Sequence, residues 1–308
     1  MRTGLLIHPS ELSRNWIDRL KSAGVDTLGI HPEGGGNAHR SLERLLCLLD
    51  DPDYRRLLDY AAELGLTIEY EFHAASWLIP RELFASHPEY FRMDEQGRRT
   101  AELNFCLTNA HALELAAGRA AELAKKLYRS SRRYYFWLDD ARSAPCLCDS
   151  CRELSASDAQ LYVLNRIIAR LREDDSDAEL AYLAYCDTLV PPSQIRPADG
   201  IFVEYAPFDR IMKKPVPPAS QDDANIRALL GCFGAKNAKV LDYWYDNSLF
   251  SGWKKPPVKF VPDDELIKSD IAYYRSAGFD YVTSFACFLG EDYEALYGEA
   301  DIGAIGKI

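Results

Sequence analysis

Residues 111–140, HALELAAGRAAELAKKLYRSSRRYYFWLDD, decide the fold, because a helical pattern is followed directly by a short aromatic strand. Residues 111–127 carry apolar side chains at helical spacing, and residues 132–140 hold an apolar run that ends in two carboxylates. A second helical pattern, DAQLYVLNRIIARLRE, begins at residue 158. A continuous apolar strand between two helices is typical of a parallel strand that is buried on both faces.

The same alternation runs along the whole chain. Strand-like runs occupy residues 4–9, 25–36, 66–80, 132–140, 178–192, 200–210, 237–250 and 280–290, with helical patterns between them. About eight such units without a linker predict an α/β protein with a single (β/α)₈ TIM barrel over residues 1–308, rather than an open doubly wound sheet. Residues 77–105, after the third strand, form a long loop that we expect to act as a lid.

Composition and charge exclude several classes of partner. The chain has 308 residues, of which 47% are hydrophobic, so it can bury a large core. Its net charge of −11 argues against binding to nucleic acid or to an anionic membrane. No apolar run reaches the roughly 20 residues that span a bilayer, and the first residues read as a strand rather than a signal peptide. We therefore expect a cytoplasmic protein, and the sequence has no motif for an organic cofactor.

Carboxylates and aromatic residues gather at the predicted carboxyl ends of the strands, where (β/α)₈ barrels carry their chemistry. Aromatic faces stack on sugar rings, and carboxylates bind sugar hydroxyls, so this composition predicts a carbohydrate pocket. The residues predicted to line it are Glu71, His73, Tyr185, Glu204, Tyr205, Asp242, Trp244 and Asp246.

Asp139 and Asp140 are the predicted catalytic pair. They follow the apolar strand 135–138 directly, where two adjacent carboxylates repel each other and one can keep its proton near neutral pH. One acid and one neighbouring base are what glycoside hydrolysis requires. The structural alternative is a turn, or a cap for the segment that follows.

Four stretches resemble a family of bacterial glycoside-hydrolase-like barrels with no settled function. They are LFASHPEYFRMDEQGRR (83–99), FCLTNAHALEL (105–115), the segment from Asp139 to Cys151, and DYWYDN (242–247). The resemblance covers most of the chain and implies the barrel fold, but it carries no chemistry.

FWLDDA (136–141) also resembles the adjacent acids of the β-N-acetylglucosaminidases that remove O-linked GlcNAc. That resemblance implies that Asp139 orients the substrate's acetamido group and that Asp140 is the general acid/base. The first strand lacks the glycine-rich run of those enzymes. For a substrate without an acetamido group, Glu204 or Asp242 is the candidate nucleophile.

Cys146, Cys148 and Cys151 have the C-x-C-x-x-C spacing of thiolate ligands, and a structural zinc site needs about four. Cys106, in the preceding strand-to-helix loop, is the best fourth ligand, with Cys186 as the alternative. The arrangement resembles the cysteine cluster of zinc-containing bacterial β-galactosidases, which implies a structural zinc. Free cysteines or a disulfide are the other interpretation.

Two other functions fit the same barrel. One is a non-catalytic barrel that binds a glycan or a protein, since acidic pairs serve binding as well as catalysis. The other is a metal-dependent sugar isomerase that uses His8, His31 and Glu71, because such barrels also collect histidines and carboxylates at the strand ends.

Overall fold

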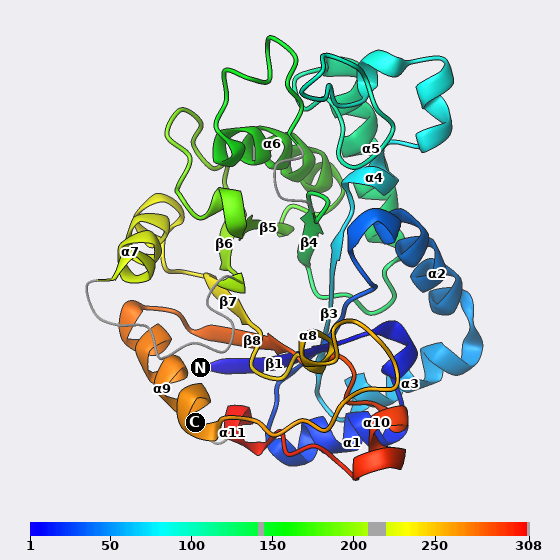
Figure 1. Cartoon of the computed structure of the whole chain (residues 1–308), viewed down its shortest axis with the longest axis vertical. Coiled ribbons are helices and arrows are strands. Elements are labelled where there is room, and N and C mark those ends of the chain that lie inside the picture. The colour runs from blue at the N-terminus through cyan, green and yellow to red at the C-terminus, as the bar shows by residue number, and fades with distance from the viewer. Residues whose placement is uncertain (141–144, 209–219, 307–308) are drawn as a thin grey trace.

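The computed structural model describes residues 1–140, 145–208 and 220–306, which form a closed barrel of eight parallel strands in sequence order (Figure 1). The predicted single barrel is confirmed. Positions 209–210, the end of the predicted sixth strand, lie outside the described residues. The strands are β1 Arg2–Ile7, β2 Thr27–Ile30, β3 Thr67–His73, β4 Arg133–Trp137, β5 Glu179–Ala184, β6 Ile201–Tyr205, β7 Lys239–Asp242 and β8 Tyr281–Phe285.

Helices surround the ring of strands (Figure 1). Pro52 divides the long helical pattern after β2 in two, because proline cannot continue a helix but fits its first turn. The Asp51 side chain caps the second of these helices. The helices are α1 Arg14–Ala23, α2 Ala38–Asp50, α3 Pro52–Glu63, α4 Ala75–Leu78, α5 Ala110–Lys126, α6 Ala156–Asp174, α7 Gln221–Phe233, α8 Asn247–Phe250, α9 Asp264–Ala277, α10 Glu291–Tyr297 and α11 Gly303–Gly306.

Alternation along each strand decides which side chains point into the barrel. In β3, Ile68, Tyr70 and Phe72 pack among the apolar residues between strands and helices. The residues between them, Glu69 and Glu71, point to the barrel axis, where they contact side chains of other strands. The same alternation applies in β7, where Val240 packs toward the helices and Leu241 points into the barrel.

Two apolar clusters follow from this alternation. The larger one fills the space between the strands and the helices. The smaller one lies inside the barrel and includes Leu6, Trp137, Leu183, Leu241 and Phe285. It lies directly under the carboxyl ends of the strands and supplies a rigid, largely apolar base for the site above it.

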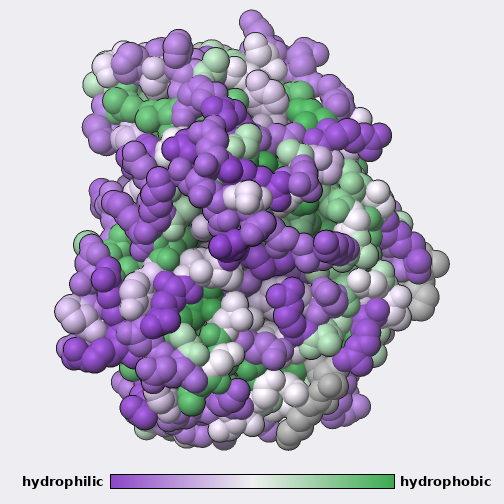
Figure 2. All heavy atoms as spheres, turned by 180° about the vertical axis from the view of Figure 1, so that it is seen from behind, coloured by the Kyte–Doolittle hydropathy of each residue, from purple (hydrophilic) through white to green (hydrophobic). Residues whose placement is uncertain are grey.

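The molecular surface is mainly polar on the face shown in Figure 2, where hydrophobic areas are small and scattered. Among the described residues, no helix has the length and apolar character needed to cross a membrane.

Candidate active site

A cavity of about 440 Å³ opens at the carboxyl ends of the strands. Its lining comes from segments that follow most of the strands, as expected for a barrel of this kind. Aromatic side chains form much of the wall: Trp137, Tyr185, Phe208, Tyr243, Trp253 and Phe285. The described carboxylates in the lining are Glu33, Asp140 and Asp246. Cavity, aromatic wall and carboxylates together suit a small polar ligand with apolar faces.

Asp140 lies at the exposed edge of the cavity, just after β4. The Tyr185 hydroxyl, from the end of β5, donates a hydrogen bond of 3.1 Å to its Oδ1. Burial, followed by the charge of Asp140, raises the pKa of Tyr185, so its hydroxyl stays a donor at neutral pH. Asp140 is therefore oriented by a neighbour and still reaches the cavity.

Asp139 has entirely different surroundings. It is only 5% exposed, and its Oδ1 accepts hydrogen bonds from the Ser76 backbone N–H (3.1 Å) and hydroxyl (3.0 Å). Its Oδ2 accepts from the backbone N–H of Asn104, and the Asn104 side chain accepts from the backbone N–H of Asp139 at 2.8 Å. Asp139 lines a neighbouring cavity of about 290 Å³, which Asp140 also lines, and it is absent from the described lining of the main one. Of the two adjacent acids, Asp140 reaches both cavities and Asp139 reaches the smaller one.

Asp246 is the buried carboxylate in the described lining of the main cavity, where Asp140 and Glu33 are exposed. It precedes α8, and its Oδ1 accepts hydrogen bonds from the Ser248 backbone N–H (3.1 Å) and hydroxyl (2.5 Å). Burial raises the pKa of Asp246, and the two donors from Ser248 and the nearby His8 oppose that rise. Burial likewise raises the pKa of Tyr243 well above its usual range, and Tyr185, Asp246 and Asp140 add to the effect.

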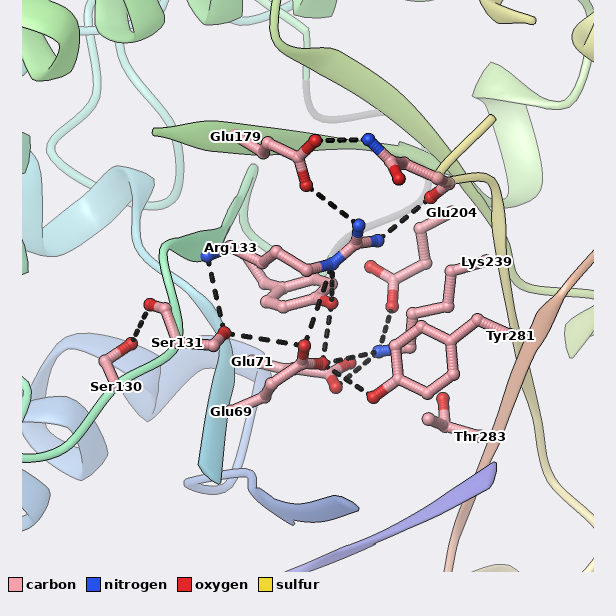
Figure 3. A network of polar contacts seen from close by, with 12 residues as sticks. Glu69, Glu71, Ser130, Ser131, Arg133, Glu179, Glu204, Lys239, Tyr281 and Thr283 are labelled. Atoms are coloured by element: carbon pink, nitrogen blue, oxygen red, sulfur yellow. Dashed lines mark hydrogen bonds and ion pairs between the residues drawn. The ribbon is translucent and has the colours of Figure 1, made fainter. Parts of the chain in front are cut away.

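Glu71 and Glu204 lie below the cavity, inside the barrel (Figure 3). Both contact the fully buried Lys239, whose Nζ is 2.9 Å from Glu204 and within ion-pair distance of Glu71. The Trp137 indole N–H donates to the other oxygen of Glu204 at 2.9 Å. This placement corrects the expectation that the two glutamates line the sugar pocket. The alternation of side chains along each strand points both glutamates into the barrel, as expected, but they lie too far below the carboxyl ends of the strands to line the cavity.

Glu69 completes this buried network (Figure 3). Its Oε2 accepts hydrogen bonds from the Tyr135 (2.6 Å) and Tyr281 (2.9 Å) hydroxyls. Burial raises the pKa of Glu71 well above its usual range; Lys239 opposes this, and the two neighbouring glutamates add to it. Arg133 lies 3.7 Å from Glu69 and 2.9 Å from Glu179. The two cations of the network, Lys239 and Arg133, therefore each face more than one carboxyl group.

Tyr205, Asp242 and Trp244 point away from the cavity, toward the helix layer. The Tyr274 hydroxyl of α9 donates to Asp242 at 2.9 Å, and the Trp244 indole N–H donates to Asp270 of the same helix at 3.0 Å. Tyr205 packs in the apolar cluster between strands and helices. These positions correct the predicted pocket set, of which His73, Tyr185 and Asp246 do line the cavity.

Several wall residues were missed as site residues, among them Phe208 after β6 and Phe288 after β8, as well as two loop segments. The loop after β2 contributes Glu33, Gly34 and Gly35. The loop after α8 contributes Trp253, which is 66% exposed and has a backbone φ of 55°, unusual for a bulky residue. The available signal in the sequence was Gly252-Trp253, a glycine and a tryptophan in the segment between β7 and the next long helix.

The long loop 77–105 does not cover the main cavity, since none of its residues is among the described lining. It contains short helical turns at Arg81–Ala85 and Pro88–Tyr90 and packs beside the loop after β4. The contacts of Asn104 with Asp139, and of Met93 with Cys146, join the two loops. The segment is a support for the β4 loop, which corrects its interpretation as a lid.

Four cysteines lie together beside these loops. The sulfurs of Cys106, Cys146, Cys148 and Cys151 lie within 4.8 Å of one another, and among the described residues this is the group with metal-ligand spacing. The Cys106 sulfur is 3.7 Å from that of Cys148 and 3.9 Å from that of Cys151. The edge of a tetrahedron with metal–sulfur bonds of about 2.3 Å is about 3.8 Å, so the group can bind a metal ion. Cys186 lies outside it.

Neighbouring donors suit a thiolate centre. The Met93 backbone N–H donates to the Cys146 sulfur at 3.3 Å, and Arg99 donates to the same sulfur at 3.5 Å. The Thr108 hydroxyl lies 3.1 Å from the Cys151 sulfur. Such hydrogen bonds and a nearby cation stabilise the negative charge of a metal–thiolate cluster.

Fold and site together define a closed (β/α)₈ barrel with an aromatic-walled cavity at the carboxyl ends of its strands. A family model matches residues 53–292, and the chain belongs to that family, which is described as a domain of unknown function (DUF4838). No curated protein has a matching sequence.

Solved structures of glycoside hydrolases share the fold. The β-galactosidase from the psychrophilic Marinomonas ef1 has 14% identity and a TM-score of 0.54, over 92% of this chain and 54% of that one. A mutant O-GlcNAc hydrolase from Thermobaculum terrenum has 11% identity and a TM-score of 0.54, over 96% and 58%. A family 5 endo-β-1,4-glucanase from Bacillus licheniformis has 10% identity and a TM-score of 0.53, over 93% of this chain and 54% of that one. This chain spans little more than half of each, and at these identities the likeness concerns the fold.

Proposed function

We propose that this protein is a glycoside hydrolase in which Asp140 is the general acid. The observation that carries the proposal is the placement of Asp140 on an aromatic-walled cavity at the carboxyl ends of the strands, with a donor from Tyr185 on its carboxylate. An acid at the cavity edge can reach the glycosidic oxygen while the sugar ring lies against the aromatic wall.

Asp246 is the second acid of the reaction in this proposal. It lies on the same cavity, after β7, and two donors from Ser248 fix its carboxylate. Glu204 and Asp242, considered from the sequence, are held by Lys239 and by Tyr274 outside the cavity. Asp246 then acts as nucleophile if the product retains its anomeric configuration, or activates water if the product is inverted.

Asp139 has a supporting role in this proposal. Both of its oxygens accept hydrogen bonds from Ser76 and Asn104, and it lines the neighbouring cavity. A role in orienting an acetamido group requires a free face toward the sugar. The proposal therefore favours a protein carboxylate over substrate assistance, while N-acetyl glycosides stay in the test panel.

The test is hydrolysis of aryl glycosides, plain and N-acetylated, by the wild type, Asp140→Asn and Asp246→Asn. We expect Asp140→Asn to lower kcat by about 10²-fold or more on phenyl glycosides and much less on dinitrophenyl glycosides, because a good leaving group does not need an acid. Asp246→Asn should lower both rates alike. NMR of the first-formed anomer assigns retention or inversion.

The control is Asp50→Asn, whose carboxylate is 86% exposed and far from the cavity. Absence of turnover on every substrate by a folded wild type would favour the non-catalytic binding barrel. Activity confined to N-acetyl substrates and abolished by Asp139→Asn in a folded protein would return Asp139 to the reaction.

For the cysteine cluster we propose a structural zinc ion held by Cys106, Cys146, Cys148 and Cys151. Its four sulfurs leave no open position for a water molecule, so the ion would fix the loops after β3 and β4 and would take no part in the chemistry. The position of Asp140 at the start of the same loop makes that rigidity relevant to the site.

A further inference from the structure

Three histidines lie at the carboxyl ends of the first three strands, His73 as the last residue of β3, and line the main cavity. We call His8, His31 and His73 the histidine row. Neighbouring ring centroids are 6.0 Å apart for the first two and 6.2 Å apart for the last two. The row has no part in the reaction proposed above, in which the two aspartates do the chemistry.

Each ring is held in the same way, by a backbone carbonyl of the next strand or its end. Nδ1 lies 2.9 Å from the His31 carbonyl for His8, 2.8 Å from the Glu71 carbonyl for His31, and 2.6 Å from the Leu138 carbonyl for His73. A carbonyl oxygen only accepts, so each Nδ1 carries the hydrogen. In a neutral imidazole, Nε2 then has a free lone pair.

No described residue makes a hydrogen bond to Nε2 in any of the three rings. Packing fixes the central ring, whose centroid is 4.8 Å from that of Phe285 and 5.8 Å from that of Trp137. Burial, and then the neighbouring His8 and His73, lower the pKa of His31 well below its usual value. The cavity therefore offers hydrogen-bond acceptors at fixed positions.

The row is too widely spaced to bind one metal ion. Three imidazole nitrogens on one ion lie about 2.0–2.1 Å from it and so within about 4 Å of one another. Among the described residues, only the four cysteines have donor atoms within 4.8 Å. The Glu71 carboxylate, which an isomerase would need beside them, is paired with Lys239 inside the barrel. The geometry thus disfavours the isomerase.

The charge of the described lining disfavours anionic ligands. None of the described residues that line the cavity is a lysine or an arginine, whereas Glu33, Asp140 and Asp246 are acidic. A ligand that donates many hydrogen bonds and carries no negative charge fits this lining. Neutral sugars, whose hydroxyls all donate, have that chemistry.

We propose that the histidine row recognises the hydroxyl groups of a neutral sugar, each ring accepting one hydrogen bond through Nε2. The proposal deepens the hydrolase function above and rests on it for the position of the sugar. It specifies the substrate class as a glycoside whose non-reducing sugar has no carboxylate, sulfate or phosphate.

The test uses Asp140→Asn, which binds substrate with little turnover, and calorimetric titration with methyl glycosides of glucose, galactose, mannose, xylose, N-acetylglucosamine and glucuronic acid. In that background, His31→Asn keeps a donor near the Glu71 carbonyl but loses the Nε2 acceptor. His31→Gln places an amide oxygen near the lost acceptor. We expect His31→Asn to raise the Kd of the best neutral ligand about tenfold or more and His31→Gln to raise it less.

The monodeoxy analogues of that ligand identify the contact. The analogue that lacks the recognised hydroxyl should bind equally with and without the His31→Asn change, whereas the other analogues should still lose affinity. His8→Asn, at a half-buried position, repeats the test where the cost to folding is smaller. His111→Asn, on the exposed start of α5, is the matched control and should bind like its parent.

Three results would overturn the proposal. If a neutral glycoside binds, and His31→Asn and His8→Asn bind it as tightly as their parent does, the row does not contact the sugar. The hydrolase proposal is then judged by the aryl glycoside panel alone. Tighter binding of the glucuronide than of every neutral glycoside contradicts the substrate class. If none of the glycosides binds and the aryl panel is also inert, the recognition and the hydrolase function fail together.

Discussion

Asp139 and Asp140 are neighbours in sequence, and both follow the end of β4, but their side chains have different surroundings. Asp140 reaches the cavity, while Asp139 turns into the protein and accepts hydrogen bonds from Ser76 and Asn104. The sequence identified the pair as important and gave no means of separating the two roles. The separation depends on Asn104, which is distant in sequence.

Asp139→Asn tests this division of roles. An amide nitrogen would replace one of the acceptors that face the N–H groups of Ser76 and Asn104, so we expect a loss of about 2–4 kcal/mol of unfolding free energy. Urea titration measures it. Asp140→Asn, at the exposed edge, should change the unfolding free energy by less than about 0.5 kcal/mol. Equal stability of both variants would show that Asp139 is not a structural acceptor.

Period-2 alternation separates the predicted pocket residues better than residue type does. In the segment from β7, Lys239, Leu241 and Tyr243 face the barrel interior or the cavity, while Asp242 and Trp244 face α9. The sequence shows which residues of a strand point into the barrel. It does not show how far below the carboxyl ends of the strands they lie, because that depends on the stagger of the eight strands. Glu71 and Glu204 were therefore expected at the rim.

At the scale of elements, the loops after β3 and β4 form one unit. Cys106 of the first loop meets three cysteines of the second, and Asn104 meets Asp139. The cysteine spacing and the order of the strands were sufficient to predict the group, because adjacent strands of a barrel place their following loops side by side. The supporting role of residues 77–105 required the three-dimensional contacts.

Zinc content and its removal test the metal centre. We expect about one zinc per chain by elemental analysis of protein purified without chelator. Prolonged treatment with a strong chelator should lower the melting temperature and reduce any glycoside binding, because the loop that begins at Asp140 loses its anchor. Cys106→Ser should behave likewise, and Cys47→Ser, at an exposed free cysteine, should not. Well under one zinc per chain, with unchanged stability in Cys106→Ser, would contradict the site.

At the scale of the whole molecule, the barrel interior combines an apolar upper part with a charged centre. Lys239 is the central cation and contacts carboxylates of β3 and β6 (Figure 3). The alternation of strands and helices was sufficient to predict the closed barrel. The charged centre was not predicted, because Lys239 and Arg133 are ordinary strand-end residues until closure brings them to the axis.

Lys239→Met should be strongly destabilising. It leaves buried carboxylates without their cation, and removing one partner of a buried ion pair costs about 3–5 kcal/mol of unfolding free energy. Burial raises the pKa of Glu71 and Lys239 opposes that rise, so without the lysine the pKa of Glu71 rises further and the folded state binds more protons than the unfolded state. The variant should therefore regain stability as the pH falls from 8 to 5.

Urea titration at several pH values measures the effect of Lys239→Met. Lys268→Met, at a half-exposed side chain that pairs with Glu265 of its own helix, is the control and should change the unfolding free energy by less than about 0.5 kcal/mol. A loss in Lys239→Met that is small, or that grows as the pH falls, would show that the central charges are not coupled as described.

Closure of the barrel joins the two ends of the described chain. β1 pairs with β2 on one side and with β8 on the other, and Leu5, Leu6 and Ile7 are fully buried only in that arrangement. At about 5–20 residues per second, a ribosome needs roughly 15–60 s to travel from the first strand to the last. During that time one edge of an apolar strand has no partner and can pair with other chains. The first strand of the barrel to be made is therefore the last to be paired on both sides, so that edge stays open to other chains until β8 has been made.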